Sequence, residues 1–267
     1  MKKSIKIAIA SQKGGGGKST LTMLLANRLY FGYNKRVLIV DCDIPQNTCF
    51  NIRKDELQKI KKIYSKQQEN INLNPEEKNM LKYFQAAYRE HPNIKEEWGI
   101  IIPEVKKGDV LTYVSNQIED YEKLGYDVVL FDTVGSISQG SQLLNLMQHM
   151  DYIFVPIEAE ESAMKPAVAS LIAFSKLSEK IKAFGFFNKF KTEKEQLKGM
   201  TNVVTIAYKM GLSILLNKDN TALYAEDKAC FRNSQVKSSL FPAENNKAYS
   251  ASEGFNLINN MCNIILK

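Results

Sequence analysis

A lysine and a serine follow directly on four glycines near the start of the chain, in the stretch Gly14-Gly15-Gly16-Gly17-Lys18-Ser19-Thr20. Residues without a Cβ atom let the backbone adopt positive φ and turn successive N–H groups toward one anion. A lysine ammonium can neutralise phosphate oxygens, and a serine hydroxyl is a ligand for Mg²⁺. This stretch therefore predicts a phosphate-binding loop in which all seven residues contact a nucleotide and Ser19 also ligates the metal.

The elements on either side of the loop favour a binding site over a flexible linker. An apolar run at residues 5–10 precedes the loop and predicts a buried strand. Leucines at helical spacing follow it, at Leu21, Leu24, Leu25 and Leu29. A helix that begins at a glycine-rich loop directs its N-terminal N–H groups at a bound phosphate. The order strand, loop, helix is the context that the motif requires.

Two further apolar runs end in acidic residues. Residues 35–40 lead into Asp41-Cys42-Asp43-Ile44-Pro45-Gln46, and residues 126–131 lead into Asp132. Carboxylates at the carboxyl ends of parallel strands point into the ligand crevice of an open sheet. Asp132 is therefore predicted to hold Mg²⁺ through water, and Asp43 is predicted to lie beside the phosphates.

The loop departs from the strict P-loop pattern, because Gln12 stands where that pattern has its first glycine. With the additional Lys13, it resembles the deviant Walker A motif of the ParA/MinD superfamily of dimeric ATPases. The resemblance continues in residues 41–46, apart from the extra Ile44, and in residues 126–135. It implies ATP and Mg²⁺ as cofactors and a Mg²⁺-dependent ATP hydrolase with weak intrinsic turnover.

The resemblance also assigns roles to individual residues. Lys13, Lys18 and Asp43 are the implied catalytic residues. Lys13 would cross to the nucleotide of the partner subunit, and Asp43 would orient the attacking water. Asn188, which follows the sixth apolar run at residues 183–187, would read the adenine edge.

Apolar strand patterns and amphipathic helix patterns alternate along the chain. This alternation favours a single three-layer α/β domain over residues 1–267, in which a mostly parallel, twisted sheet of about seven strands has helices on both faces. The chain is 44% hydrophobic and 24% charged, which is typical of a globular protein. Residues 53–98 are rich in Lys, Glu, Gln and Asn and are predicted to form a polar helical elaboration, for which a peripheral helical hairpin is favoured over a partner surface.

Cysteine and histidine usage argues against other classes of protein. Cys42, Cys49, Cys230 and Cys262 include no C-x-x-C pair, and the only histidines, His91 and His149, are far apart in the chain. A metal cluster or a disulfide framework is therefore not expected. No stretch approaches the roughly 20 apolar residues of a membrane span. The sequence predicts a soluble, cytoplasmic protein.

The net charge of +7 is unevenly distributed. Residues 176–267 hold 14 Lys and Arg against 8 Asp and Glu. Such an excess of basic residues indicates either a surface that binds nucleic acid or helix faces exposed to solvent, and the sequence leaves both interpretations open. The candidate DNA contacts are Lys209, Lys218, Lys228, Arg232 and Lys237.

The last predicted helix, residues 252–266, separates two functions that the resemblance allows. A membrane-binding tail of the MinD kind needs Lys or Arg on its polar face, whereas this helix has asparagines there and only Lys267 as a cation. We therefore expect it to pack on the body of the protein.

The leading hypothesis is a ParA-like ATPase. It forms a homodimer with ATP, binds DNA nonspecifically, responds to a ParB-like or other stimulating protein and does not bind membrane. It would act in partition or transfer of a plasmid, chromosome or mobile element. The alternative is a MinD-like, membrane-associated positioning ATPase. A metallocluster carrier is disfavoured because a close cysteine pair is lacking, and a DNA-binding module without activity is disfavoured because Lys18, Ser19, Asp43 and Asp132 are all present.

Overall fold

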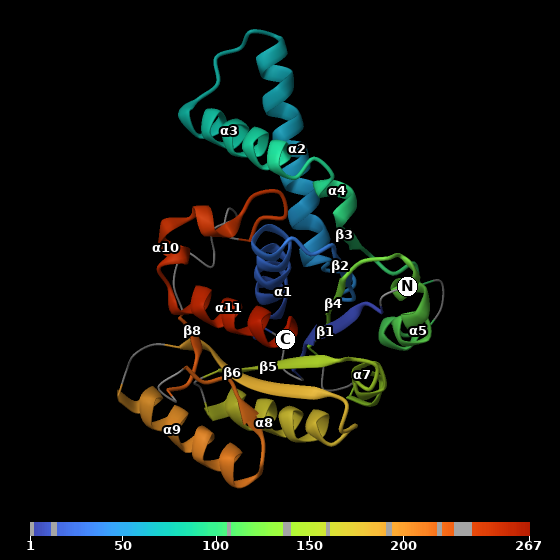
Figure 1. Cartoon of the computed structure of the whole chain (residues 1–267), viewed down its shortest axis with the longest axis vertical. Helices are drawn as coiled ribbons and strands as arrows, with labels where there is room; N and C mark the ends of the chain where they lie inside the picture. Colours follow the sequence, from blue (N-terminus) through green and yellow to red (C-terminus); the bar gives the residue numbers. More distant parts are fainter. Residues whose placement is uncertain are drawn as a thin grey trace.

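The computed structural model describes residues 3–11, 15–105, 108–135, 140–158, 161–190, 194–217, 221–226 and 237–267. Its centre is one parallel sheet in the order β3-β2-β4-β1-β5-β6-β7, with β8 also paired to β6 (Figure 1). The strands are β1 (Ile5–Ile9), β2 (Val37–Asp41), β3 (Trp98–Ile101), β4 (Val128–Asp132), β5 (Tyr152–Glu158), β6 (Lys182–Phe190), β7 (Ser213–Ile214) and β8 (Tyr224–Glu226). The prediction of a single three-layer α/β domain is confirmed.

Helices cover both faces of this sheet. They are α1 (Lys18–Asn27), α2 (Thr48–Gln68), α3 (Pro75–Glu90), α4 (Ile94–Glu97), α5 (Val110–Asn116), α6 (Ile118–Lys123), α7 (Gly140–Met147), α8 (Glu161–Ser175), α9 (Lys194–Lys209), α10 (Lys247–Ser250) and α11 (Glu253–Ile265). A π-helical turn, η1 (Arg28–Gly32), continues α1, and a 3-10 turn, η4 (Ala243–Asn245), precedes α10.

Alternate residues of each strand enter two separate cores. Ile7 and Ile9 of β1 pack in one core with α1, η1 and α11. Ala8 of the same strand packs in the other core with α5, α7 and α8. Strands buried on both faces read as continuous apolar runs, which is why the sequence revealed them.

Some boundaries differ from those predicted. The amphipathic pattern after residue 109 predicts one helix, but the structure divides it into α5 and α6 at Gln117, whose ψ is 9°. The apolar run at residues 212–216 contributes only the two-residue β7, and β8, at the end of the short apolar run at residues 222–225, was not predicted. Asn188 lies within β6 rather than after it.

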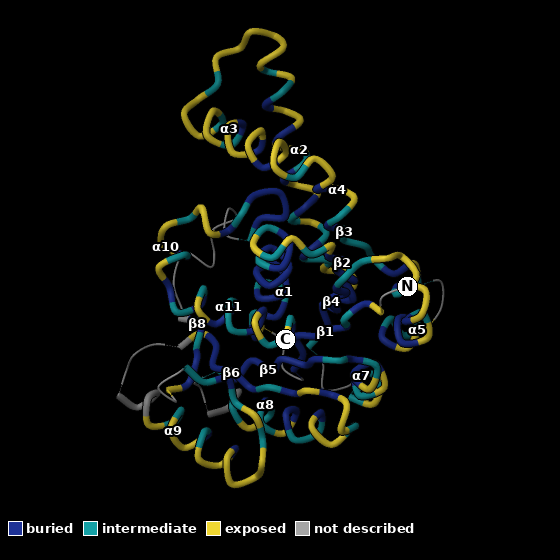
Figure 2. Tube along the Cα trace, viewed as in Figure 1, coloured by how far each residue is buried: buried dark blue, intermediate teal, exposed yellow. Residues whose placement is uncertain are grey.

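Residues 53–98 lie mainly in α2 and α3, which project from the sheet as an exposed helical pair (Figures 1 and 2). Asn74 caps α3, because its side chain accepts from the N–H of Glu77 while Glu77 accepts from the N–H of Asn74. The base of α2 is anchored: Glu56 is buried and accepts hydrogen bonds from the N–H and hydroxyl of Ser239, at 2.8 and 2.6 Å.

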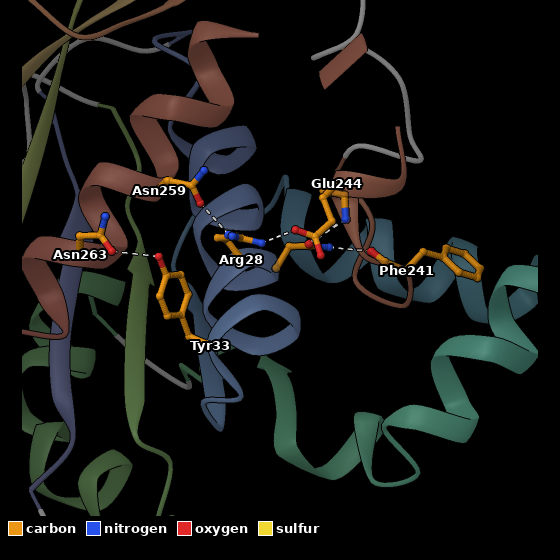
Figure 3. Close-up of polar contacts among 8 residues, drawn as sticks. Arg28, Tyr33, Phe241, Glu244, Asn259 and Asn263 are labelled. Carbon is orange, nitrogen blue, oxygen red and sulfur yellow. Dashed lines mark hydrogen bonds and ion pairs between the residues drawn. The ribbon is translucent and has the colours of Figure 1, made fainter. Parts of the chain in front are cut away.

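The C-terminal helix α11 packs on the body of the protein, as predicted. Leu257, Ile258 and Met261 are fully buried in the core beside α1. Its asparagine face is also in contact, since Asn259 accepts from Arg28 Nε at 2.6 Å and Asn263 accepts from the Tyr33 hydroxyl at 3.0 Å (Figure 3). Among the described residues, no helix combines the length and apolarity needed to cross a membrane.

Candidate nucleotide-binding site

The predicted site residues of three strands meet at one edge of the sheet. Ile9 at the end of β1 and Asp41 at the end of β2 are both in register with Asp132 at the end of β4. The loops that leave these carboxyl ends therefore start side by side, at the edge where open parallel sheets bind ligands. The glycine loop, both acidic runs and the start of α1 share this edge.

Two glycines in the described part of the loop have a backbone conformation that favours glycine. Gly15 and Gly17 have φ of 75° and 74°, in the left-handed region that other residues rarely adopt. Gly17 also caps α1, and its carbonyl accepts the first helical hydrogen bond, from Leu21 N at 3.0 Å. The N–H groups of the first turn of α1 are thus available to an anion. Lys13 and Gly14 lie outside the described residues.

Lys18, the first residue of α1, is almost completely buried, with 6% of its surface exposed. Burial lowers its pKa, and the nearby carboxylates of Asp132, Asp43 and Glu158 oppose that shift. A buried ammonium surrounded by acids is held at the site in advance of a phosphate ligand. Ser19 and Thr20 follow on the same helix and are half-buried.

Asp132 has no exposed surface. Thr22 Oγ1 lies 3.4 Å from its Oδ1, and Cys49 Sγ lies 3.3 Å from its Oδ2. Burial raises the pKa of Asp132 to about 7, although a hydrogen bond from Ser19 acts in the opposite direction. A carboxylate beside a serine hydroxyl is a donor set that fits Mg²⁺, which prefers oxygen ligands and retains several waters. This donor set fits the prediction that Ser19 and Asp132 bind Mg²⁺, and their metal role stays a prediction.

The two acids that follow β2 have different surroundings. Asp41 is fully buried and accepts hydrogen bonds from the N–H of Phe50 at 3.0 Å and of Asp43 at 3.4 Å. Burial raises the pKa of Asp41, and the bond from Phe50 opposes this. Asp43 is only half-buried and is one of the carboxylates that act on Lys18. Asp41 thus caps the first turn of α2, while Asp43 is left beside the phosphate loop.

Strand β6 contacts the glycine loop from the other side. Asn188 Nδ2 donates to the carbonyl of Gly16 at 2.7 Å, and a Cβ atom at Gly17 would lie 2.8 Å from the same nitrogen. Lys189 Nζ donates to the carbonyl of Gly15 and lies 3.3 Å from Glu158 Oε1. Asn188 is therefore in contact with the loop, and its predicted contact with adenine stays a prediction.

Several residues of the site were absent from the sequence-based prediction. Thr22 follows Lys18 by four positions, so helical spacing could have placed it on the same face of α1. Cys49, Glu158 and Lys189 have no local signal, because their contacts depend on which elements neighbour one another in the sheet. Within the described ranges, no group of three or more His, Cys, Asp or Glu residues could hold a metal ion.

The predicted DNA contacts are placed only in part. Lys209 ends α9 and is exposed, and Lys237 is half-buried at the start of the segment that leads to Ser239. Lys218, Lys228 and Arg232 lie outside the described residues. The structure therefore does not test these five residues as one surface.

A phosphate loop between β1 and α1, with an acidic residue at the end of β4, defines the fold of a P-loop nucleotide-binding protein. A family model described as an AAA domain matches residues 4–184, which is more than half of the chain. The chain belongs to this family, the ParA/MinD family of ATPases. A comparison with curated proteins found no matching sequence.

Solved structures share the fold along the whole chain. MinD of Aquifex aeolicus is 18% identical, with a TM-score of 0.61 and coverage of 99% of this chain and 98% of that one. A protein of Borrelia burgdorferi B31 assigned to plasmid partition, solved with AMPPNP, is 21% identical, with a TM-score of 0.56 and 99% coverage of both chains. The ATP complex of a Cyanothece McdA variant is 12% identical, with a TM-score of 0.57 and coverage of 98% and 97%.

Proposed function

We propose that this protein is a ParA-like ATPase that dimerises with ATP, binds DNA nonspecifically as the dimer and is released by hydrolysis. The observation that carries the proposal is the meeting of Lys18, Asp43 and Asp132 at the carboxyl edge of the sheet. A structural ion-pair cluster would not need left-handed glycines at a helix N-terminus beside it. This combination suits a nucleoside triphosphate with its metal ion.

Each residue of the site has a task in this proposal. The N–H groups of the first turn of α1 bind phosphate oxygens, and Lys18 neutralises their charge. Ser19 and Asp132 would hold Mg²⁺, Asp132 through water, and the ion would supply further charge neutralisation on the phosphates. Asp43 orients the attacking water, since phosphoryl transfer requires mainly positioning and charge stabilisation.

The proposed dimer depends on Lys13, by its resemblance to the family motif. A lysine that reaches the nucleotide of the partner subunit joins two subunits only when phosphate charge is present. Two of the structural relatives were solved with ATP or an ATP analogue, which supports ATP as the ligand. The MinD protein of Aquifex aeolicus was also solved in complex with MinC, which shows that a relative assembles with a partner protein.

Partition is favoured over membrane positioning by the C-terminal helix. The apolar face of α11 is buried in the core, and its asparagine face contacts Arg28 and Tyr33 (Figure 3). A membrane-binding helix needs a free apolar face and cations on its polar face. This arrangement supports DNA rather than lipid as the surface that the ATP-bound dimer binds, with a ParB-like or other protein stimulating its turnover.

The test is nucleotide-dependent binding to DNA duplexes of unrelated sequence, measured by fluorescence anisotropy with ATP, with ADP and without nucleotide. We expect binding only with ATP, equal for all sequences and steeply weaker at higher salt, because phosphate contacts release counterions. Lys18→Ala is the matched control and should not bind DNA. Binding that ignores nucleotide or salt contradicts the proposal, and ATP-dependent flotation with liposomes would support the MinD-like alternative instead.

A further inference from the structure

Asp132 is held by side chains from two different helices. Thr22 Oγ1 on α1 faces one carboxylate oxygen at 3.4 Å, and Cys49 Sγ on α2 faces the other at 3.3 Å. All three side chains are completely buried. Both donors therefore act on a carboxylate that bulk water does not reach, where the loss of a hydrogen bond is costly.

The two donors belong to the helices that begin at the nucleotide site. Thr22 follows Ser19 by three residues, so both hydroxyls lie on the same side of α1. Cys49 is the second residue of α2, whose first turn is fixed by the bond from Phe50 N to Asp41. Cys49 Sγ also lies 3.8 Å from the carbonyl of Ser19. The contacts of Cys49 thus join α2 to both predicted metal-binding residues.

A buried cysteine elsewhere in the chain shows the contrast. Cys262 on α11 and Cys49 on α2 are equally buried and belong to the same apolar core. Cys49 additionally directs its thiol at the carboxylate of Asp132, 3.3 Å away. A thiol is a weak hydrogen-bond donor, and its hydrogen bond is strongest when the acceptor is charged. Apolar packing alone therefore does not explain why the Cys49 thiol faces a carboxylate.

We propose that Thr22 and Cys49 are positioning residues that hold the Asp132 carboxylate from both sides in the orientation that Mg²⁺ requires. This inference rests on the proposed function, in which Asp132 holds the metal. Residues that orient the ligands of a metal commonly affect its affinity by 10- to 100-fold. The same contacts connect α2, from which the α2–α3 pair projects, to the predicted metal-binding residues.

The test measures Mg²⁺ dependence rather than turnover. A fluorescent ATP analogue is titrated with the parent, Thr22→Val, Cys49→Ala and Cys49→Ser, with and without Mg²⁺. Thr22→Val and Cys49→Ala should need about tenfold more Mg²⁺ for half-maximal binding, with unchanged affinity in EDTA. Cys49→Ser keeps a donor and should remain close to the parent. Cys262→Ala is the matched control for loss of a buried thiol and should behave as the parent.

Three outcomes overturn the inference. If Thr22→Val and Cys49→Ala both show the Mg²⁺ dependence of the parent, the inference about these two residues is wrong, while the proposed function is unaffected. A Cys49→Ser variant as weak as Cys49→Ala would mean that packing, not the hydrogen bond, matters at this position. If nucleotide binding by the parent does not depend on Mg²⁺, Asp132 has no metal role, and the proposed roles of Thr22 and Cys49 are then also wrong. Thermal melting of each variant verifies folding, and the near-isosteric Thr22→Val keeps the test decisive if Cys49→Ala is unstable.

Discussion

The N–H of Phe50 donates a hydrogen bond of 3.0 Å to the carboxylate of Asp41, so this acid fixes the start of α2. Loss of a side chain that caps a helix N-terminus costs about 0.5–2 kcal/mol. We expect Asp41→Ala to lower the free energy of unfolding by about that amount in urea denaturation. Asp41 accepts on both carboxylate oxygens, so Asp41→Asn keeps one acceptor but turns an NH2 group toward the other N–H donor, and its stability should lie between those of Asp41→Ala and the parent. A parent-like Asp41→Ala would contradict the capping role.

Asp43 should separate nucleotide binding from hydrolysis. If it orients water, Asp43→Ala and Asp43→Asn should both bind ATP while phosphate release falls by about tenfold or more, since correct positioning contributes strongly to phosphoryl transfer. ATP-bound dimers should then accumulate on a sizing column. Normal turnover in Asp43→Asn would instead indicate a turn-stabilising role, for which Asn serves equally well.

Lys18→Ala should abolish nucleotide binding. Lys18 is the cation that begins α1, whereas Lys189, which also lies at the loop, already bonds to the Gly15 carbonyl and lies close to Glu158, so it does not replace the charge of Lys18 on the phosphates. Calorimetry with ATP and Mg²⁺ should show no measurable heat of binding, while thermal melting shows a folded protein. Unchanged ATP affinity would remove Lys18 from the site.

Lys13→Ala should affect the dimer and not the nucleotide affinity of the monomer. In the proposed role, Lys13 contributes to the dimer interface only by contacting the phosphates of the nucleotide bound to the partner subunit. We expect ATP to bind as in the parent but no longer to shift the protein to a dimer on a sizing column. A variant that dimerises normally would show that the family role of this lysine does not apply here.

The stability of the metal-free protein should depend on Asp132 and on pH. Its pKa is raised to about 7 by burial, above the ordinary value of 3.8, so the folded state binds this proton more tightly than the unfolded state. Stability therefore falls as pH rises from about 4 to about 7, by roughly 1–4 kcal/mol from this group. Asp132→Asn cannot ionise, so in EDTA it should exceed the parent in melting temperature at pH 8 more than at pH 5. An equal difference at both pH values contradicts the raised pKa.

Much of the site was readable from the sequence because its signals are local. Four consecutive glycines before Lys18 and Ser19 mark a phosphate loop where a strand precedes and a helix follows. An apolar run that ends in Asp132 marks a strand tip, and the spacing of Phe255, Ile258, Met261, Cys262 and Ile265 marks a helix with one buried face. In each case the physical signal lies within a few neighbouring residues, so no tertiary contact was needed to recognise it.

Tertiary structure decided which of these residues meet. From sequence, Asp41 and Asp43 are two acids on one loop. The fold directs Asp41 to the first turn of α2 and leaves Asp43 near Lys18. Asn188 contacts Gly16, and Cys49 contacts Asp132, across 172 and 83 residues of chain. Such pairs depend on strand order and register, and these are fixed by the burial of both faces of the whole sheet rather than by the residues that come into contact.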